Sequence, residues 1–569
     1  MKNKFSLFVC VLVSLVLLQF RATYNPDPSS KELKVTTWDS FGYYAYLPSV
    51  FIYDDCKQLN WVPTIDSIYD LTGGNLYQAG KVENGNYVFM YLGGVSILQT
   101  PLFAVGHLIA KNSHYPADGF SAPYQYSLAY GVILYFVLTL LLLRSILLRY
   151  FNDFSVSLTI LLVVLATNLI QYVGIDNAQS HAYIFPLYVL ILYFTIKWHE
   201  KPSVFFASAI GLTIGLATIC RPTELIMLFI PLLWNLHTKE SSKTKWKLVR
   251  ANKSHLFFAI AFAIIGILPQ LIYWKLITGS IVHEVGSKWV FANPFFRVLF
   301  GWETGWFIYT PATVFFVVGL FFMKRFPFKK SVLVFCLLNI WVVISWFDWK
   351  YGSTYSTRAL VQSYPIFTLS LAAFIHYFSS KRWKYLMLIP ALYFIGVNLF
   401  QIHQYNTTVL HSRDMNRMYY ASIYLNPSPT PLDMSLLDTD EILRSEVKNY
   451  REMILSESDK LIKSNALVDS PSVFYNSDLK LSPDWIRISC KIKSDKGFGS
   501  SYISYSFNKK KKDIRLFNAI STKNEWNKYE FFIKNEEKTE ANLLKLSIVS
   551  LISFKGEIKD LKVIGYMNK

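Results

Sequence analysis

Ionisable side chains that lie directly beside long apolar stretches are the first candidates for chemistry in this sequence. Asp39 lies in the segment 38–48, shortly after the first apolar stretch, and Tyr43 and Tyr44 follow it. An aspartate can accept a proton from an attacking hydroxyl group, and tyrosine rings suit the interface between lipid and water. We predict that Asp39 is a catalytic base and that Tyr43 and Tyr44 line the substrate site. The alternative is a loop aspartate beside an aromatic belt, and position alone does not separate the two.

Three basic side chains occupy similar positions and suit a phosphate group. Arg221 begins the sequence Arg-Pro-Thr-Glu between two apolar stretches, and Lys350 and Arg358 lie in the polar segment 346–358. Arginine binds phosphate in bidentate fashion and lysine as a point charge. Fixed cations also stabilise the charge of a departing phosphate without reorganisation. We expect Arg358, Lys350 and Arg221 to hold a donor phosphate; the alternative for Arg221 is contact with lipid phosphates.

Other polar residues lie at the boundaries of apolar stretches, where ionisable groups are costly and tend to be functional if they face a cavity. The predicted substrate-binding residues of this kind are Asp176, His181, Glu303 and Asp348. No glycine-rich phosphate loop is present, which agrees with a donor carried on a lipid. The five cysteines show no ligand spacing, and Asp54-Asp55 is interpreted as an exposed loop pair. We therefore predict no cofactor and no required metal.

Composition places these residues in a membrane protein. Of the 569 residues, 52% are hydrophobic and 17% are charged, and the mean hydropathy is +0.28. Soluble chains carry about 25% charged residues. The net charge of +19 is spread over short basic runs between apolar stretches, which is how membrane proteins fix their orientation. A nucleic-acid binder would gather these charges on one soluble surface, so we predict contact with membrane lipids and none with nucleic acid.

Eleven apolar stretches approach the roughly 20 residues that a membrane-spanning helix needs. They are residues 5–21, 126–148, 155–174, 182–197, 203–220, 223–237, 255–277, 307–323, 331–347, 359–378 and 384–402. One more candidate, 88–110, is interrupted by Gly93-Gly94, Pro101 and His107. Without it, every basic run falls on one side of the membrane. The positive-inside rule thus predicts about eleven spans with the N-terminus in the cytoplasm, and we interpret 88–110 as re-entrant or interfacial.

The chain divides by pattern into a membrane domain and a terminal β domain. Residues 1–403 form the predicted all-α polytopic bundle, including an outer loop at 22–125, and residues 404–469 form a linker that is partly helical over 436–462. From 470 to 569, short runs alternate apolar and polar residues, which is typical of a β-sandwich of the jelly-roll type. Trp485 and Trp526 could stack on sugar rings there, although a core role is commoner. This domain is predicted to be periplasmic and to be a candidate for carbohydrate binding.

These features resemble the class C (GT-C) membrane glycosyltransferases, which use polyprenyl-phosphate sugars and include the protein O-mannosyltransferases and the lipid A aminoarabinose transferase. More narrowly, the chain looks like the members common in Bacteroidetes-type bacteria. The similarity covers residues 5–403. It rests on Asp39 after the first span, Asp176 to His181, Arg221-Pro222-Thr223, Tyr309-Thr310-Pro311 and Asp348 to Arg358.

The resemblance implies an inner-membrane enzyme that transfers a hexosyl or pentosyl group, with inversion, from a polyprenyl-phosphate donor to a periplasmic glycan, lipid or protein. In that family an acid of the first outer loop is the catalytic base, which here falls on Asp39. The family commonly has Asp-Glu at this place, whereas Ser40 follows Asp39 in this chain. One alternative is a transporter or flippase of lipid-linked sugars, which predicts polar residues along the depth of several helices and an internal repeat. Another is an O-antigen-ligase-like enzyme, which consumes a diphosphate-linked glycan.

Overall fold

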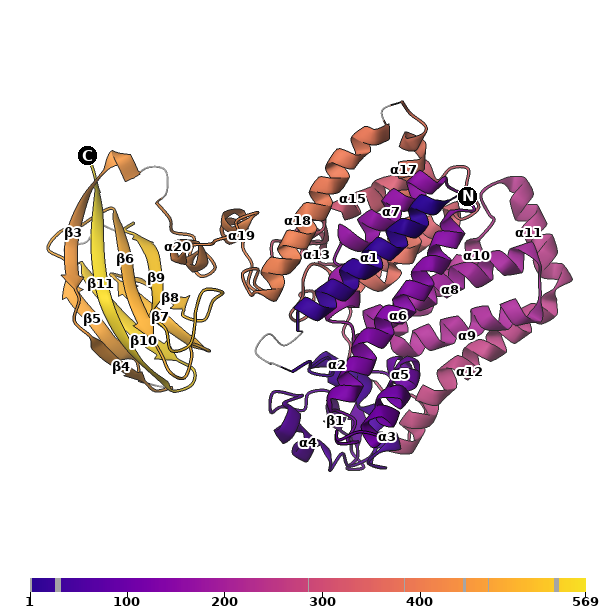
Figure 1. Ribbon diagram of the computed structural model, residues 1–569, viewed down its shortest axis with the longest axis horizontal. Coiled ribbons are helices and arrows are strands. Elements are labelled where there is room, and N and C mark those ends of the chain that lie inside the picture. The colour runs from indigo at the N-terminus through magenta and orange to yellow at the C-terminus, as the bar shows by residue number, and fades with distance from the viewer. Residues whose placement is uncertain are drawn as a thin grey trace. The chain divides into compact units, whose positions relative to one another are not determined.

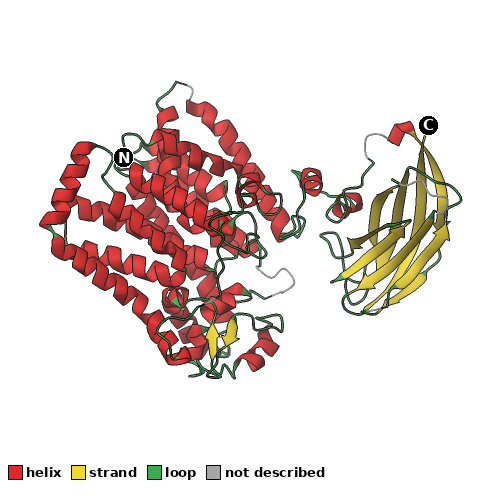
Figure 2. Ribbon diagram, turned by 180° about the vertical axis from the view of Figure 1, so that it is seen from behind, coloured by secondary structure: helices red, strands yellow, loops and turns green. Residues whose placement is uncertain are grey.

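The structure, a computed structural model, describes residues 3–25, 32–284, 286–382, 384–443, 447–468, 470–536 and 542–569. The chain splits into two compact units, Met1–Ile402 and His403–Lys569. Figure 2 shows helices with one small strand pair in the first unit and mainly strands in the second. The predicted combination of a helical N-terminal part and an all-β C-terminal part is therefore confirmed.

Six helical segments are long and apolar enough to cross a membrane. They are α1 (Lys4–Thr23), α6 (Ala122–Leu147), α8 (Ser180–Glu200), α12 (Lys253–Thr278), the segment Arg358–Ser379 and the segment Lys384–Asn406. The fifth joins the 3-10 helix η5 (Arg358–Ser363) to α17 (Tyr364–Ser379), and the sixth joins η6 (Lys384–Met387) to α18 (Leu388–Asn406). Helices of this length cover the roughly 30 Å of a hydrocarbon core, so the chain is a multi-pass membrane protein.

The predicted count of about eleven spans is not confirmed, because the other five apolar stretches form shorter or interrupted helices. These are α7 (Asp153–Leu165) with η1 (Gln171–Ile175), α9 (Val204–Cys220), η2 (Pro222–Leu228) with α10 (Phe229–Leu233), the series α14 (Trp306–Tyr309), η3 (Pro311–Thr313), α15 (Val314–Gly319) and η4 (Leu320–Phe322), and α16 (Lys329–Ile344). Proline accounts for two of the breaks, since it lacks an N–H and disfavours helix in the residue before it. Thus α9 ends just before Pro222, and Pro311 separates α14 from α15.

Residues 32–121, which we call the loop region, fold at one end of the helices (Figure 1). They contain α2 (Asp39–Tyr44), α3 (Tyr46–Phe51), α4 (Val62–Tyr69), β1 (Ala79–Lys81), β2 (Tyr87–Phe89) and α5 (Gly94–Lys111). Helix α5 covers most of the predicted re-entrant segment and packs tightly on other helices. A Cβ at Gly94 would lie 2.5 Å from the backbone nitrogen of Cys220 at the end of α9, and a Cβ at Gly106 would lie 2.9 Å from the Cα of Tyr124 in α6. Glycine at these positions lets α5 hold the loop region against the bundle.

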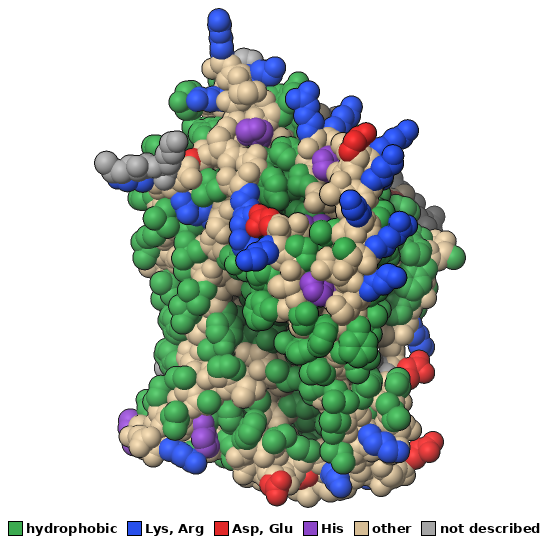
Figure 3. Space-filling view, turned by 90° about the vertical axis from the view of Figure 1, so that its right-hand side faces the viewer, with side chains coloured by type: hydrophobic (Ala, Val, Ile, Leu, Met, Phe, Trp, Pro, Cys, Tyr) green, Lys and Arg blue, Asp and Glu red, His purple; other side chains and the backbone are tan. Residues whose placement is uncertain are grey.

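Charged side chains are unevenly distributed over the surface of the first unit. Figure 3 shows Lys and Arg gathered toward the upper end of one face, a broad hydrophobic band below them, and a few charges of both signs at the lower end. Helix α11 (Lys239–Ala251), which connects α10 to α12, carries five basic residues, of which only Lys245 is buried. On α12, large apolar side chains such as Phe257, Ile264 and Leu276 are exposed. An apolar belt between polar ends is the surface expected in contact with lipid.

The second unit is a sandwich of two antiparallel sheets. A four-stranded sheet has the order β5-β10-β7-β8, and a five-stranded sheet has the order β3-β11-β6-β9, with β4 also paired to β11. The strands are β3 (Tyr450–Ser458), β4 (Ile462–Ala466), β5 (Ser472–Asp478), β6 (Trp485–Lys493), β7 (Ser501–Phe507), β8 (Lys510–Arg515), β9 (Asn527–Lys534), β10 (Leu543–Ser550) and β11 (Phe554–Asn568). Alternate residues of β6, including Ile486, Ile488 and Ile492, are fully buried in the core, as the period of two requires.

The linker differs from its prediction. The short helices α19 (Arg417–Ile423), α20 (Pro431–Ser435) and η7 (Val447–Asn449) lie in it, but strands β3 and β4 replace the end of the predicted helix 436–462 and the residues after it. These strands pair with two parts of β11, close to the C-terminus. Such distant pairing overrides a weak local helical pattern. Trp485 is partly buried and packs beside Phe532, with ring centres 6.3 Å apart, against the buried cluster of Leu443, Phe532 and Tyr566.

Candidate active site

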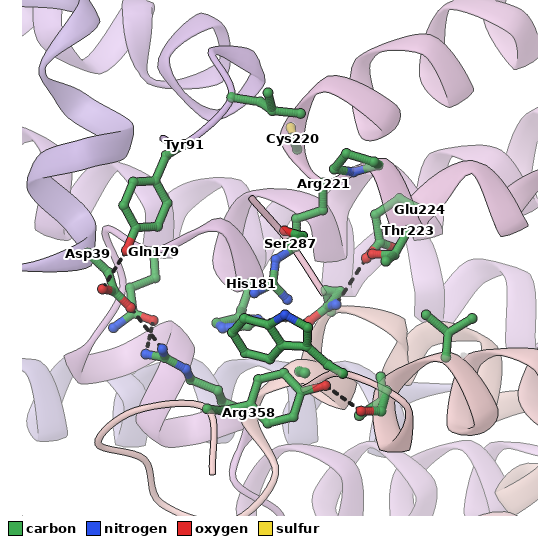
Figure 4. A pocket seen from close by; sticks show the side chains of 18 of the residues that line it. Asp39, Tyr91, Gln179, His181, Cys220, Arg221, Thr223, Glu224, Ser287 and Arg358 are labelled. Carbon is green, nitrogen blue, oxygen red and sulfur yellow. Dashed lines mark hydrogen bonds and ion pairs between the residues drawn. The ribbon is translucent and has the colours of Figure 1, made fainter. Parts of the chain in front are cut away.

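A cavity of about 350 Å³ lies between the loop region and the ends of several helices of the first unit. Its walls include five of the predicted site residues: Asp39, Tyr43, His181, Arg221 and Arg358. In Figure 4, Asp39, Tyr91 and Arg358 lie on one side of the cavity, Glu224 lies on the other, and Arg221 and His181 lie between them. The volume is within the range of sites for small ligands or for the head of a larger one.

Asp39, the first residue of α2, is the centre of a polar cluster. Its Oδ2 lies 2.8 Å from Nη2 of Arg358, an ion pair between residues 319 positions apart. Its Oδ1 accepts hydrogen bonds from the hydroxyl groups of Tyr91 at 2.7 Å and Tyr77 at 2.9 Å. Gly42 permits the approach of Tyr91, because a Cβ there would collide with the tyrosine ring. The Asp39 side chain remains 26% exposed, so a ligand in the cavity can reach it.

The surroundings of Asp39 favour its ionised form. Burial alone raises the pKa of the carboxyl group, but the charge of Arg358 and the hydrogen bonds from Tyr91 and Tyr77 outweigh it, and the net pKa lies below its usual value. Burial and the charge of Asp39 raise the pKa of both tyrosines, so their hydroxyl groups stay protonated and donate. Asp39 is therefore a carboxylate at neutral pH, which is the form that can accept a proton.

Arg358, the first residue of η5, is held by side chains from two distant segments, Asp39 and Gln179. The preceding residue, Thr357, anchors the chain by donating a hydrogen bond from its Oγ1 to the carbonyl of Val298 at 2.8 Å. Nη1 of Arg358 donates to Oε1 of Gln179 at 3.0 Å while Nη2 faces Asp39. Nε of Arg358 is buried and has no hydrogen-bond partner among the described residues. The guanidinium is thus fixed in direction and retains a donor.

Arg221 brings a second cation to the same cavity. It follows the last residue of α9, where Pro222 ends the helix and leaves Arg221 with extended backbone. Its side chain lines the cavity and forms no ion pair among the described residues. An arginine side chain without an ion pair in a cavity is available to bind an anion.

Three further buried side chains, those of Glu224, Gln362 and His181, line the part of the cavity that lies away from Asp39. Glu224 accepts hydrogen bonds from the hydroxyl group of Tyr188 and from Nε2 of Gln362, the latter at 3.0 Å. Oε1 of Gln362 lies 2.8 Å from Nδ1 of His181. Glu224, Gln362 and His181 are each at most 2% exposed. These hydrogen bonds satisfy the polar groups of the three side chains, whose burial without a hydrogen-bond partner would cost free energy.

Two predicted substrate-binding residues lie elsewhere in the first unit, with Tyr44 buried and Asp176 half-buried. Tyr44 lies within the loop region, where its hydroxyl group donates to the carbonyl of Gly119 at 2.5 Å. Asp176 accepts a hydrogen bond from Nε2 of Gln171 at 2.9 Å and does not line the cavity. The sequence predicted correctly that both residues lie at the end of the helices where the cavity is. It did not predict the direction of their side chains.

Three residues of the polar loops also lie outside the cavity wall. Glu303 is half-buried in the turn before α14, Asp348 is exposed, and the Lys350 ammonium lies 5.5 Å from the ring centre of Trp349. The loop of Asp348 and Lys350 turns at three residues with positive φ, Tyr351, Gly352 and Ser356. Residues a few positions apart in such loops face different ways, so these three predictions are corrected for this cavity.

Several residues of the site were not predicted. Tyr77 comes from a stretch of the loop region without a periodic pattern, and Tyr91 lies in the candidate stretch 88–110, where nothing distinguished its side chain from its neighbours. Gln179 lies in a segment already singled out beside His181. Gln362 was detectable as a polar residue inside the apolar stretch 359–378, where an amide needs a partner. Among the described residues, no three His, Cys, Asp or Glu side chains are placed to hold a metal ion.

No family model and no curated protein matches the chain. Among solved structures, the oligosaccharyltransferase AglB from Archaeoglobus fulgidus is similar with a TM-score of 0.43 and 11% identity, covering 74% of this chain and 57% of that one. ArnT from Cupriavidus metallidurans is similar with a TM-score of 0.43 and 14% identity, covering 74% and 66%. The arabinosyltransferase EmbB from Mycobacterium smegmatis is similar with a TM-score of 0.37 and 10% identity, covering 98% and 64%.

The chain thus spans less than two thirds of the length of each of these proteins. At this level of similarity, no substrate and no residue role passes from them to this chain.

Proposed function

We propose that the chain is a glycosyltransferase that moves a sugar from a polyprenyl-phosphate donor to an acceptor hydroxyl group. The pairing of Asp39 with Arg358 in one cavity carries the proposal. A carboxylate that is ionised at neutral pH can serve as a base. Arg358 and Arg221 provide the positive charge that a phosphate leaving group needs. The two functions lie within one site of suitable size.

In the proposed reaction, the acceptor oxygen attacks the anomeric carbon of the sugar from the side opposite the phosphate. The bond from the anomeric carbon to the phosphate oxygen breaks, and the configuration of that carbon inverts. Asp39 takes the proton of the acceptor hydroxyl group, and the polyprenyl phosphate leaves with the bonding electron pair. Arg358 and Arg221 stabilise the charge that grows on the phosphate, and Tyr91 keeps the Asp39 carboxylate oriented.

We also propose on which side of the membrane the cavity lies. The loop region lies at the end of the helices opposite the N-terminus (Figure 1), and Lys and Arg are gathered toward the upper end of the face in Figure 3. The positive-inside rule assigns a basic end to the cytoplasm. The cavity and the second unit would then be periplasmic, where the acceptor is a glycan, a lipid or a protein.

The first test is release of sugar from a panel of polyprenyl-phosphate sugars by the purified full chain in lipid vesicles, with and without acceptors. Turnover that depends on an acceptor and yields the inverted anomer supports the proposal. Turnover only with diphosphate-linked glycans would favour the ligase-like alternative. Movement of intact lipid-linked sugar between leaflets, with no release, would favour a flippase.

A further inference from the structure

Glu224, Gln362 and His181 form a series of hydrogen bonds in which the donor and the acceptor of each bond can be assigned, starting from Glu224. Each carboxylate oxygen of Glu224 accepts one bond, from Tyr188 and from Gln362. Nε2 of Gln362 lies 3.0 Å from Oε1 of Glu224, so the NH₂ group of the amide faces Glu224. The amide oxygen then faces Nδ1 of His181 at 2.8 Å. That oxygen can only accept, so Nδ1 carries the hydrogen.

The other ring nitrogen of His181 is left as an acceptor. In a neutral imidazole one nitrogen donates and the other accepts, and the partner of the first decides which. The ring lines the cavity, and Nε2 has no hydrogen-bond partner among the described residues. Arg221 and Arg358 line the same cavity, so a charged imidazolium would face two like charges. The ring is therefore held neutral, with a lone pair on Nε2.

We propose that His181 forms a hydroxyl-binding subsite whose Nε2 accepts a hydrogen bond from the ligand, and that Gln362 and Glu224 are positioning residues that fix this tautomer. The cavity otherwise offers cations and the Asp39 carboxylate for charged or reacting groups, and His181 adds a neutral acceptor. Sugars are rich in hydroxyl donors. Recognition of a sugar hydroxyl here rests on the proposed function; the tautomer does not.

The tautomer can be measured without any activity assay. Full-length protein labelled with ¹⁵N-histidine is studied in lipid bilayers by solid-state NMR, and the His181 signals are identified by their loss in His181→Gln. A protonated Nδ1 with an unprotonated Nε2 supports the proposal. A protonated Nε2 or a charged ring in the wild type overturns it, whatever the variants do.

Two glutamine variants test the positioning role. Gln362→Leu removes the acceptor of Nδ1, so both tautomers become populated. Gln99→Leu is the matched control, because Gln99 is also fully buried but donates to the carbonyl of Ala178 and not to the chain of bonds at His181. The control keeps the wild-type tautomer. An unchanged tautomer in folded Gln362→Leu would refute the role of Gln362.

The ligand is tested with deoxy analogues of whichever polyprenyl-phosphate sugar is turned over. Removing the hydroxyl group that His181 binds lowers kcat/KM about tenfold for the wild type and leaves it nearly unchanged for His181→Phe, which has no acceptor. Equal losses in both proteins for every analogue overturn the subsite. If no polyprenyl-phosphate sugar is turned over, the proposed function fails, and the NMR result still decides the tautomer.

Discussion

Replacing Asp39 with asparagine keeps the size of the side chain but removes its charge and its ability to take a proton. The amide oxygen can still accept from Tyr91 and Tyr77, whereas the amide nitrogen would face Nη2 of Arg358 in place of Oδ2. Loss of a general base slows a reaction by about 10²- to 10⁴-fold, or about 3–5 kcal/mol in the barrier. We expect turnover to fall by about a thousandfold while donor binding is largely kept.

The same change also has a cost in stability, which must be separated from the catalytic effect. A hydrogen bond to a charged group contributes about 1.5–3 kcal/mol, and Arg358 keeps its second bond to Gln179. Since the Asp39 side chain is partly exposed, we expect a loss near the lower limit, about 1.5 kcal/mol. The variant should therefore remain folded.

The assay compares sugar release, donor binding and thermal unfolding of the wild type, Asp39→Asn and Asp54→Asn. Asp54→Asn is the matched control, because Asp54 is an exposed aspartate of the same loop region with a backbone φ of 46° that asparagine also tolerates. The control should keep wild-type turnover. Turnover of folded Asp39→Asn within about threefold of the wild type would remove Asp39 as the base.

The remaining predictions concern the cations and the pH profile. Tyr91→Phe removes a hydrogen bond to the Asp39 carboxylate and so raises its pKa. In the wild type, the acidic limb of the turnover profile lies below the usual aspartate pKa. In Tyr91→Phe the carboxylate is protonated at a higher pH, so this limb moves toward neutral pH. A limb that does not move would contradict this origin of the low pKa. Arg221→Gln should raise KM for the donor about tenfold, since a charged bond to phosphate is lost; an unchanged KM would exclude Arg221 from the phosphate site. Lys350→Gln, outside the cavity wall, should change KM by less than about twofold, and a tenfold rise would show that Lys350 reaches the donor.

Helix lengths and strand positions show how far local pattern predicts this fold. Apolar composition and length predicted α1, α6, α8 and α12 because a spanning helix needs a long apolar run whatever its neighbours are. The stretch 307–323 has enough apolar residues, yet Pro311 divides it. Strands β3 and β4 depend on pairing with β11, which no local pattern contains.

The sequence by itself determined that this is a membrane protein with a terminal sandwich, and that Asp39, Arg221, His181 and Arg358 lie at helix boundaries. Those facts follow from amino-acid composition and from the spacing of apolar residues, both of which can be recognised within short stretches of the chain. Only the tertiary structure decided that Asp39 meets Arg358 across 319 positions. It also placed Asp176, Glu303, Asp348 and Lys350 outside the cavity wall. Side-chain direction in irregular loops depends on packing and hydrogen bonding to distant residues, and no residue spacing encodes it.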